Sequence, residues 1–236
     1  MNQNHALMTT NRELDEEPRT YLRRIIEAQA YRQLMAMNIR GHCLKFLTDV
    51  ESKIRVAEEL QLNLAILREV RGLYREYGFE DVESAVRDRM TQIPYPESRL
   101  EFRVFRHVCG FALKVAMDSY VDCSNRNLAA IARSYIDGRR GELEDPEFVE
   151  FCQDESNHPH AQQMFTRWFA IAVRSFGRPG TLGDSRAVEL GLRSKTSGEM
   201  LEAFANAMRE FTARVGLELP EADQFGLELA GNSPKG

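Results

Sequence analysis

The sequence of 236 residues lacks the patterns that mark several specialised classes of protein. Glycine and proline are sparse, at 15 and 8 residues, which excludes a collagen-like or low-complexity chain. No run of about 18 apolar residues occurs, so we expect no transmembrane helix and no membrane partner. The N-terminal segment is acidic and lacks the apolar stretch of a signal peptide. We therefore expect a globular, cytoplasmic protein.

Motifs of common enzyme and nucleic-acid-binding classes are also missing. The chain contains no GxSxG, P-loop, GxGxxG or HExxH pattern, so hydrolase, kinase and dinucleotide-binding functions have no support. Lysine and arginine total 31 against 36 acidic residues, and no basic block is dense enough to follow a phosphate backbone. Nucleic acid is therefore not expected as a partner.

The four cysteines form no CxxC pair, which excludes a zinc ribbon and a thioredoxin-type motif. We expect them to be buried free thiols in a reducing compartment. They are Cys43, Cys109, Cys123 and Cys152.

Apolar residues recur at three-to-four spacing through most of the chain, and no clear alternating β-branched run occurs. This pattern predicts an all-α protein. Glycine after a periodic segment marks expected helix ends at Gly41, Gly78 and Gly216, and Thr196 with Glu199 marks an expected N-cap. The expected helices cover residues 18–41, 49–77, 98–123 with a possible continuation to 136, 147–177 with a break near Pro159, and 196–216.

No internal repeat and no linker divides the chain. We expect a disordered N-terminal segment over residues 1–17, a single helical domain over 18–223 and a flexible tail over 224–236.

The pattern Glu-x-x-His at Glu155 and His158 is the main candidate for chemistry. On a helix this spacing places a carboxylate and an imidazole on one face, one turn apart. Iron and manganese favour mixed carboxylate and imidazole ligands, and facing helices of a bundle can supply them. The motif is weak alone, so it needs companions on other helices.

Two residues are candidate companions. Glu59 stands beside leucines in the middle of the second expected helix, where a carboxylate is expected to be paired, exposed or metal-bound. His107 lies among apolar residues of the third, where a buried structural histidine is the more common role.

Three segments resemble the phenylacetic acid catabolic family, which includes phenylacetyl-CoA epoxidase. They are DESNHPHAQQ, RWFAIAVRSFGRPGTLGDS and SGEMLEAFANAMREFTARVGLELPEAD. The resemblance covers residues 150–223, and extends over 20–135 in helix placement alone. It implies a ferritin-like bundle with a di-iron centre that inserts oxygen from dioxygen into the ring of a CoA thioester. It also implies a reductase as electron donor and assembly with copies of the chain or with a paralogous subunit.

The family's ligand set is a carboxylate from each of two helices and an ExxH pair from each of two others. The resemblance places one ExxH on Glu155 and His158 and one carboxylate on Glu59. The remaining ligand positions fall on residues that bind iron poorly or not at all: Gln33, Leu62 and a position near Gly110.

Two functions follow from this partial ligand set. In the first, Glu59, Glu155 and His158, completed by His107, hold iron or manganese, and the protein is an oxygenase acting on an organic substrate such as a CoA thioester. In the second, the chain is a non-catalytic structural or acyl-CoA-binding subunit that has lost the di-iron site.

Overall fold

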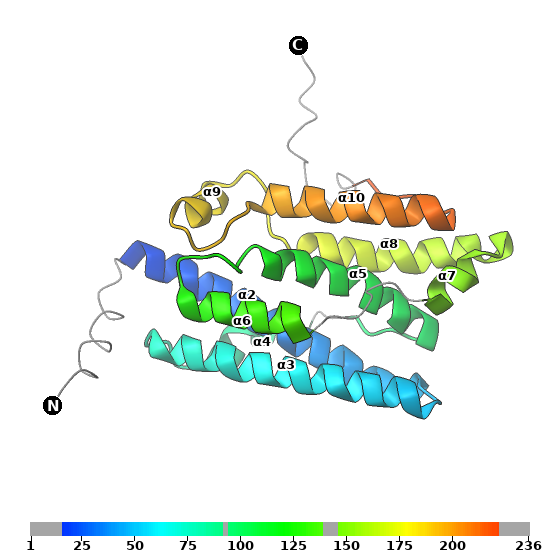
Figure 1. The fold of residues 1–236 in the computed structure, drawn as a ribbon, viewed down its shortest axis with the longest axis horizontal. Coiled ribbons are helices and arrows are strands. Elements are labelled where there is room, and N and C mark those ends of the chain that lie inside the picture. Colours follow the sequence, from blue (N-terminus) through cyan, green and yellow to red (C-terminus); the bar gives the residue numbers. More distant parts are fainter. Residues whose placement is uncertain (1–15, 92–93, 139–145, 222–236) are drawn as a thin grey trace, which may run out of the picture.

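The computed structural model describes residues 16–91, 94–138 and 146–221, and every regular element within these ranges is a helix (Figure 1). The prediction of an all-α helical bundle is confirmed. None of the helices in these ranges has both the length and the apolar composition needed to cross a membrane. The predicted tail and most of the predicted disordered segment lie outside the described residues. Glu16 and Glu17 are the exception, because they already belong to the first helix.

Five long helices run approximately along one direction and make up most of the bundle (Figure 1). Helix α2 packs against α3, and α5 packs against α8 and α10. The long helices are α2 (Glu16–Cys43), α3 (Val50–Glu76), α5 (Arg99–Asp118), α8 (His158–Arg174) and α10 (Ser197–Val215).

Local capping chemistry sets several helix ends where the sequence predicts them. Asp49 accepts a hydrogen bond from the Ser52 backbone N–H at 2.7 Å and so starts α3. Thr196 and Glu199 form a capping box at the start of α10. Gly216 ends that helix in the left-handed conformation, with φ 71°.

Two predicted boundaries are wrong. Helix α2 passes through Gly41 to Cys43, because a glycine without C-cap geometry weakens a helix but does not end it. The third helix stops at Asp118, where the hydroxyl of Ser119 donates to the Ala116 carbonyl. A separate helix, α6 (Arg126–Gly138), then starts with Asn125 accepting from the Leu128 N–H.

The predicted fourth helix is divided into three elements. These are α7 (Pro146–Cys152), a 3₁₀ turn η2 (Glu155–Asn157) and α8. Asp154 caps the 3₁₀ turn through the Ser156 N–H, and Pro159 occupies the first turn of α8, where proline is favoured. The expected break therefore occurs before Pro159, with Glu155 in η2 and His158 as the first residue of α8.

Three further helical elements complete the described ranges. They are η1 (Leu44–Phe46), α4 (Val82–Met90) and α9 (Leu182–Glu189). Helix α9 has no counterpart among the helices expected from the sequence, although Thr181 caps it by accepting from the Asp184 N–H.

Two clusters of buried apolar residues form the core. The first surrounds Trp168 between α5, α8 and α10, and the second joins α2, α3 and α6. All four cysteines are buried and free, which confirms the prediction for the thiols. Burial raises the pKa of Cys43 to about 12 and that of Cys152 to about 11, so both remain protonated at neutral pH.

Candidate ligand-binding cavity

Glu59, a predicted metal ligand, makes two ion pairs. Its carboxylate accepts from Arg40 Nε at 2.6 Å and from Arg106. The side chain of Arg40 is only 3% exposed, so Glu59 supplies the negative charge that a buried guanidinium requires.

Glu155 and His158 lie in two successive elements, because the 3₁₀ turn η2 ends at Asn157 and α8 begins at His158. Glu155 is exposed in the 3₁₀ turn η2. The His158 imidazole lies 2.8 Å from the Cys152 carbonyl oxygen through Nε2, and it packs over Gly216. His158 therefore connects the start of α8 to the preceding segment and to the end of α10.

His107 is buried on α5, and the centroid of its ring lies 4.2 Å from that of the Phe211 ring on α10. Among residues 16–91, 94–138 and 146–221, no three His, Cys, Asp or Glu side chains gather in a group that could hold a metal ion. The structure thus does not bring the four predicted ligands together, and metal binding stays a prediction.

Neutral amides occupy the interior between α2 and α3. Gln33 is fully buried, and its Oε1 accepts from Asn63 Nδ2 at 2.5 Å. The resemblance places a family carboxylate at Gln33, so the residue present is a neutral hydrogen-bonding amide rather than a charged iron ligand.

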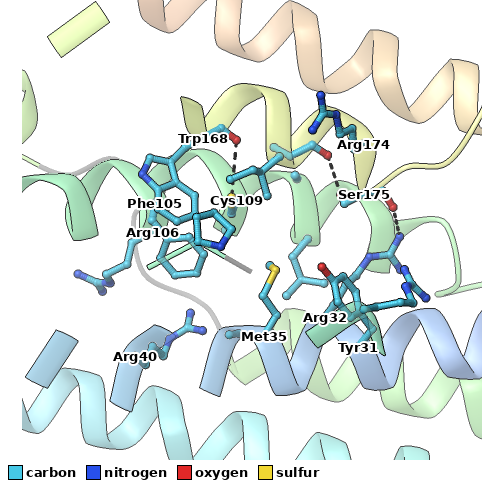
Figure 2. A pocket seen from close by; sticks show the side chains of 18 residues that line it. Tyr31, Arg32, Met35, Arg40, Phe105, Arg106, Cys109, Trp168, Arg174 and Ser175 are labelled. Carbon is cyan, nitrogen blue, oxygen red and sulfur yellow. Dashed lines mark hydrogen bonds between the residues drawn. The ribbon is translucent and has the colours of Figure 1, made fainter. Parts of the chain in front are cut away.

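A cavity of about 290 Å³ lies between α2, α5 and α8 (Figure 2). Its wall combines an apolar surface with arginines, and no acidic side chain of the described residues lines it. The apolar wall includes Met35, Phe105, Cys109, Leu113, Trp168, Ile171 and Ala172, and the arginines are Arg32, Arg40, Arg89, Arg106 and Arg174.

Arg32 is the most informative of these arginines. The residue is 7% exposed, and its Nη2 donates to the Ser175 carbonyl oxygen at the end of α8, at 2.6 Å. Its Nη1 is buried and has no hydrogen-bond acceptor among the described residues. No carboxylate of these residues pairs with it, whereas buried arginines are almost always paired.

The positive charge of Arg32 acts on its surroundings. Burial lowers the pKa of Arg193, and the charge of Arg32 lowers it further. Arg193 has its own carboxylate partner, Asp184. The wall around Arg32 is therefore positive within a chain of net charge −5, and such a site attracts anions.

The remaining arginines differ in burial and in partners. Arg89 and Arg174 line the cavity and are exposed. The guanidinium of Arg89 lies 4.2 Å over the Tyr31 ring, a cation–π contact that holds this ring in the wall. Arg40 and Arg106 share the carboxylate of Glu59.

Aromatic and sulfur groups form the apolar wall. The rings of Phe105 and Trp168 meet edge to face at 5.1 Å, and the Cys109 thiol donates to the Trp168 carbonyl at 3.8 Å. Burial raises the pKa of Cys109, which keeps the thiol neutral and unreactive.

The sequence pattern does not reveal this cavity. Its arginines come from helices far apart in the chain, and charged residues on helices are common, so Arg32 alone gives no signal. The spacing of Arg32, Ala36 and Arg40 places them on one side of α2, but only the packed structure shows that this side faces α5 and α8.

No protein-family model and no curated protein shows a significant match to this chain. The resemblance to the phenylacetic acid catabolic family therefore stays a prediction from the three sequence segments.

Proposed function

We propose that this protein binds an organic anion with an apolar body in the cavity between α2, α5 and α8. The observation that carries the proposal is the buried guanidinium of Arg32, which has no carboxylate partner among the described residues and lines an apolar cavity. An anionic ligand supplies the missing charge, and its apolar part removes the surface around Trp168 from water.

The cavity volume limits what enters it. About 290 Å³ is at the small end of the range for ligand sites, roughly 300–1,000 Å³. It accommodates a short acyl or aryl group, whereas the nucleotide of a CoA ester would have to remain outside. The sequence suggests, as one of two functions, a non-catalytic structural or acyl-CoA-binding subunit. The proposal limits the ligand of such a subunit to a small organic anion.

The alternative of a metal-dependent oxygenase stays a prediction, as do the ferritin-like relationship, the cytoplasmic location and assembly with like subunits. Glu59 is engaged by two arginines and Glu155 is exposed, so neither position favours the oxygenase over the binding function.

Isothermal titration calorimetry with octanoate tests the proposal, with octanamide as the matched uncharged ligand. We expect octanoate to bind with one molecule per chain and octanamide to bind at least tenfold more weakly, because a charge-assisted hydrogen bond contributes about 1.5–3 kcal/mol. Equal binding of the two ligands, or no binding of either, contradicts the proposal.

Arg32→Gln is the informative variant, and Arg19→Gln is its matched control. Arg19 also lies on α2 and donates to a backbone carbonyl, that of Tyr77 at 2.8 Å, but it does not line the cavity. We expect Arg32→Gln to weaken octanoate binding about tenfold or more and Arg19→Gln to leave it unchanged. Circular dichroism confirms that both variants are folded.

A further inference from the structure

We infer that the head group of the ligand is a dianion, and that the cavity binds a phosphate monoester with an apolar chain more tightly than a carboxylate of similar length. This inference rests on the proposed binding function and specifies the ligand class. It follows from the number of arginines in the wall and from the charges that compensate them.

Arg32 provides a buried donor for the anion. Its Nη2 is already committed to the Ser175 carbonyl, and its Nη1 has no acceptor among the described residues. A ligand oxygen at Nη1 accepts a charge-assisted hydrogen bond without breaking the contact between α2 and the end of α8.

Arg89 brings a second guanidinium to the surroundings of Arg32. Arg89 belongs to α4, and its Cζ lies 4.2 Å from the centroid of the Tyr31 ring. Tyr31 directly precedes Arg32 on α2, and all three residues line the cavity. Burial raises the pKa of Tyr31, while the positive charges of Arg89 and Arg32 oppose this rise. Both charges therefore act on the same part of the cavity.

Positive charge exceeds negative charge around the cavity. Neither Arg32 nor Arg89 pairs with a carboxylate of the described residues, and no acidic side chain of these residues lines the wall. Arg40 and Arg106 share the single carboxylate of Glu59, so they add to the positive potential of the same cavity. A dianion gains more from this potential than a monoanion does.

A phosphate monoester is the dianion that suits this arrangement. Near neutral pH it carries close to two negative charges on one small head group, and it offers three acceptor oxygens. One oxygen can accept from Arg32 Nη1, while the second charge is attracted by Arg89. A dicarboxylate carries the same charge but places half of it at the far end of an apolar chain. The chain of a phosphate monoester is uncharged, so it can contact the apolar wall beside Phe105 and Trp168.

Calorimetry on the full chain compares three ligands: octyl phosphate, octanoate as the monoanion with a similar chain, and inorganic phosphate without a chain. At about pH 7.5 we expect octyl phosphate to bind at least fivefold more tightly than octanoate and at least tenfold more tightly than inorganic phosphate.

The outcomes separate the inference from the proposed function. If octyl phosphate binds no more tightly than octanoate and both depend on Arg32, the preference for a dianion is wrong while the proposed function holds. If inorganic phosphate binds as tightly as octyl phosphate, the apolar chain has no part in binding and the ligand class is wrong. If neither octyl phosphate nor octanoate binds, the proposed function itself is overturned.

The pH dependence of the preference identifies the charge state that binds. The second pKa of a phosphate monoester is about 6. The titratable groups of the wall are arginines, Tyr31 and Cys109, which keep their charge states from about pH 5.5 to about pH 7.5. The octanoate titration corrects for other groups, such as Glu59 beside Arg40. We expect the preference for octyl phosphate to fall at least twofold on acidification over this range, and a constant preference overturns binding of the dianion.

Arg89→Gln tests the second charge, and Arg24→Gln is its matched control. Arg24 is also exposed and also lies over a tyrosine ring, that of Tyr21, but both residues are outside the cavity. We expect Arg89→Gln to weaken octyl phosphate binding several-fold and octanoate binding less, and Arg24→Gln to change neither. An unchanged preference for octyl phosphate in a folded Arg89→Gln variant overturns the role of Arg89.

Discussion

Two arginines on one helix show how identical residues acquire different roles. Arg32 and Arg40 both line the cavity and are both at least nine-tenths buried. Arg40 pairs with Glu59 on α3, whereas Arg32 donates to the Ser175 backbone carbonyl at the end of α8 and pairs with no carboxylate of the described residues. The partner of Arg40, Glu59, is 19 positions away in the sequence, and the partner of Arg32, Ser175, is 143 positions away. A property fixed by such distant partners cannot be read from the local sequence.

The sequence identified individual candidates but not their partners. Glu59 was expected to be paired, exposed or metal-bound, and it is paired with two arginines. A buried structural histidine is the more common role for the surroundings of His107, and His107 is buried against Phe211. Local sequence shows that a charged or polar residue lies in an apolar surrounding, but it does not show which group compensates it.

Replacement of Glu155 separates the two functions at the residue level. The side chain is exposed in the 3₁₀ turn, so we expect Glu155→Ala to change neither the melting temperature nor the content of iron, manganese and zinc per chain. Elemental analysis of the purified wild type and variant measures this directly. Near-stoichiometric iron or manganese that is lost in Glu155→Ala would support the oxygenase instead.

At the scale of elements, helix starts were predicted more accurately than helix continuity. Asp49 and Thr196 cap their helices as predicted, because an N-cap depends on residues three or four positions away. The divisions at 119–125 and 153–154 were missed or misplaced. They depend on side-chain caps such as Asn125 and Asp154, whose sequence signals are short and also occur within helices.

The junction of α8 and α10 gives a prediction at the element scale. A Cβ at Gly216 would lie 2.8 Å from Cε1 of His158, and the φ of 71° disfavours any other residue. We expect Gly216→Ala to lower the free energy of unfolding by about 2 kcal/mol, from backbone conformation and the clash together. Urea denaturation measures the change.

Gly72→Ala is the matched control, because Gly72 lies within α3 and a Cβ there meets nothing within 4 Å. Alanine at this helical position should stabilise the protein by up to about 1 kcal/mol. Equal effects of the two substitutions would contradict the assigned contact between His158 and the end of α10.

At the scale of the whole molecule, the cavity lies where the two core clusters meet. Phe105, Cys109 and Trp168 belong to the first cluster, and Leu113 belongs to the second. The helical class was predictable because it follows from apolar periodicity along the chain. The arrangement of the helices was not predictable. Apolar periodicity shows which side of each helix is buried, but it does not show which other helix packs against that side.

Buried thiols make the stability of the molecule sensitive to alkaline pH. Cys43 has an ordinary pKa of 9.0 when unfolded and about 12 when folded, so its neutral thiol stabilises the fold fully below pH 9. This contribution is lost as pH rises from about 9 to about 12. We expect the free energy of unfolding to fall over this range and the fall to be less steep in Cys43→Ala, by up to roughly 1.4 kcal/mol per pH unit.

Urea denaturation at a series of pH values from 7 to 12 measures the slope in both proteins. The loss of packing in Cys43→Ala is independent of pH, so it shifts the curve without tilting it. Parallel curves for the wild type and the variant would show that Cys43 does not hold its proton as described.

The fluorescence of Trp168 tests the central claim most directly, because it is the only tryptophan in the sequence and it lines the cavity. Titration with 8-bromooctanoate should quench it along a saturable curve, since the bromine quenches only at short range. Unbrominated octanoate should compete, and Arg32→Gln should move the midpoint of the curve to a concentration about tenfold higher or more, while Arg19→Gln leaves the midpoint unchanged. Quenching that stays linear in concentration, or that is the same in Arg32→Gln as in the wild type, would contradict binding of an organic anion in this cavity.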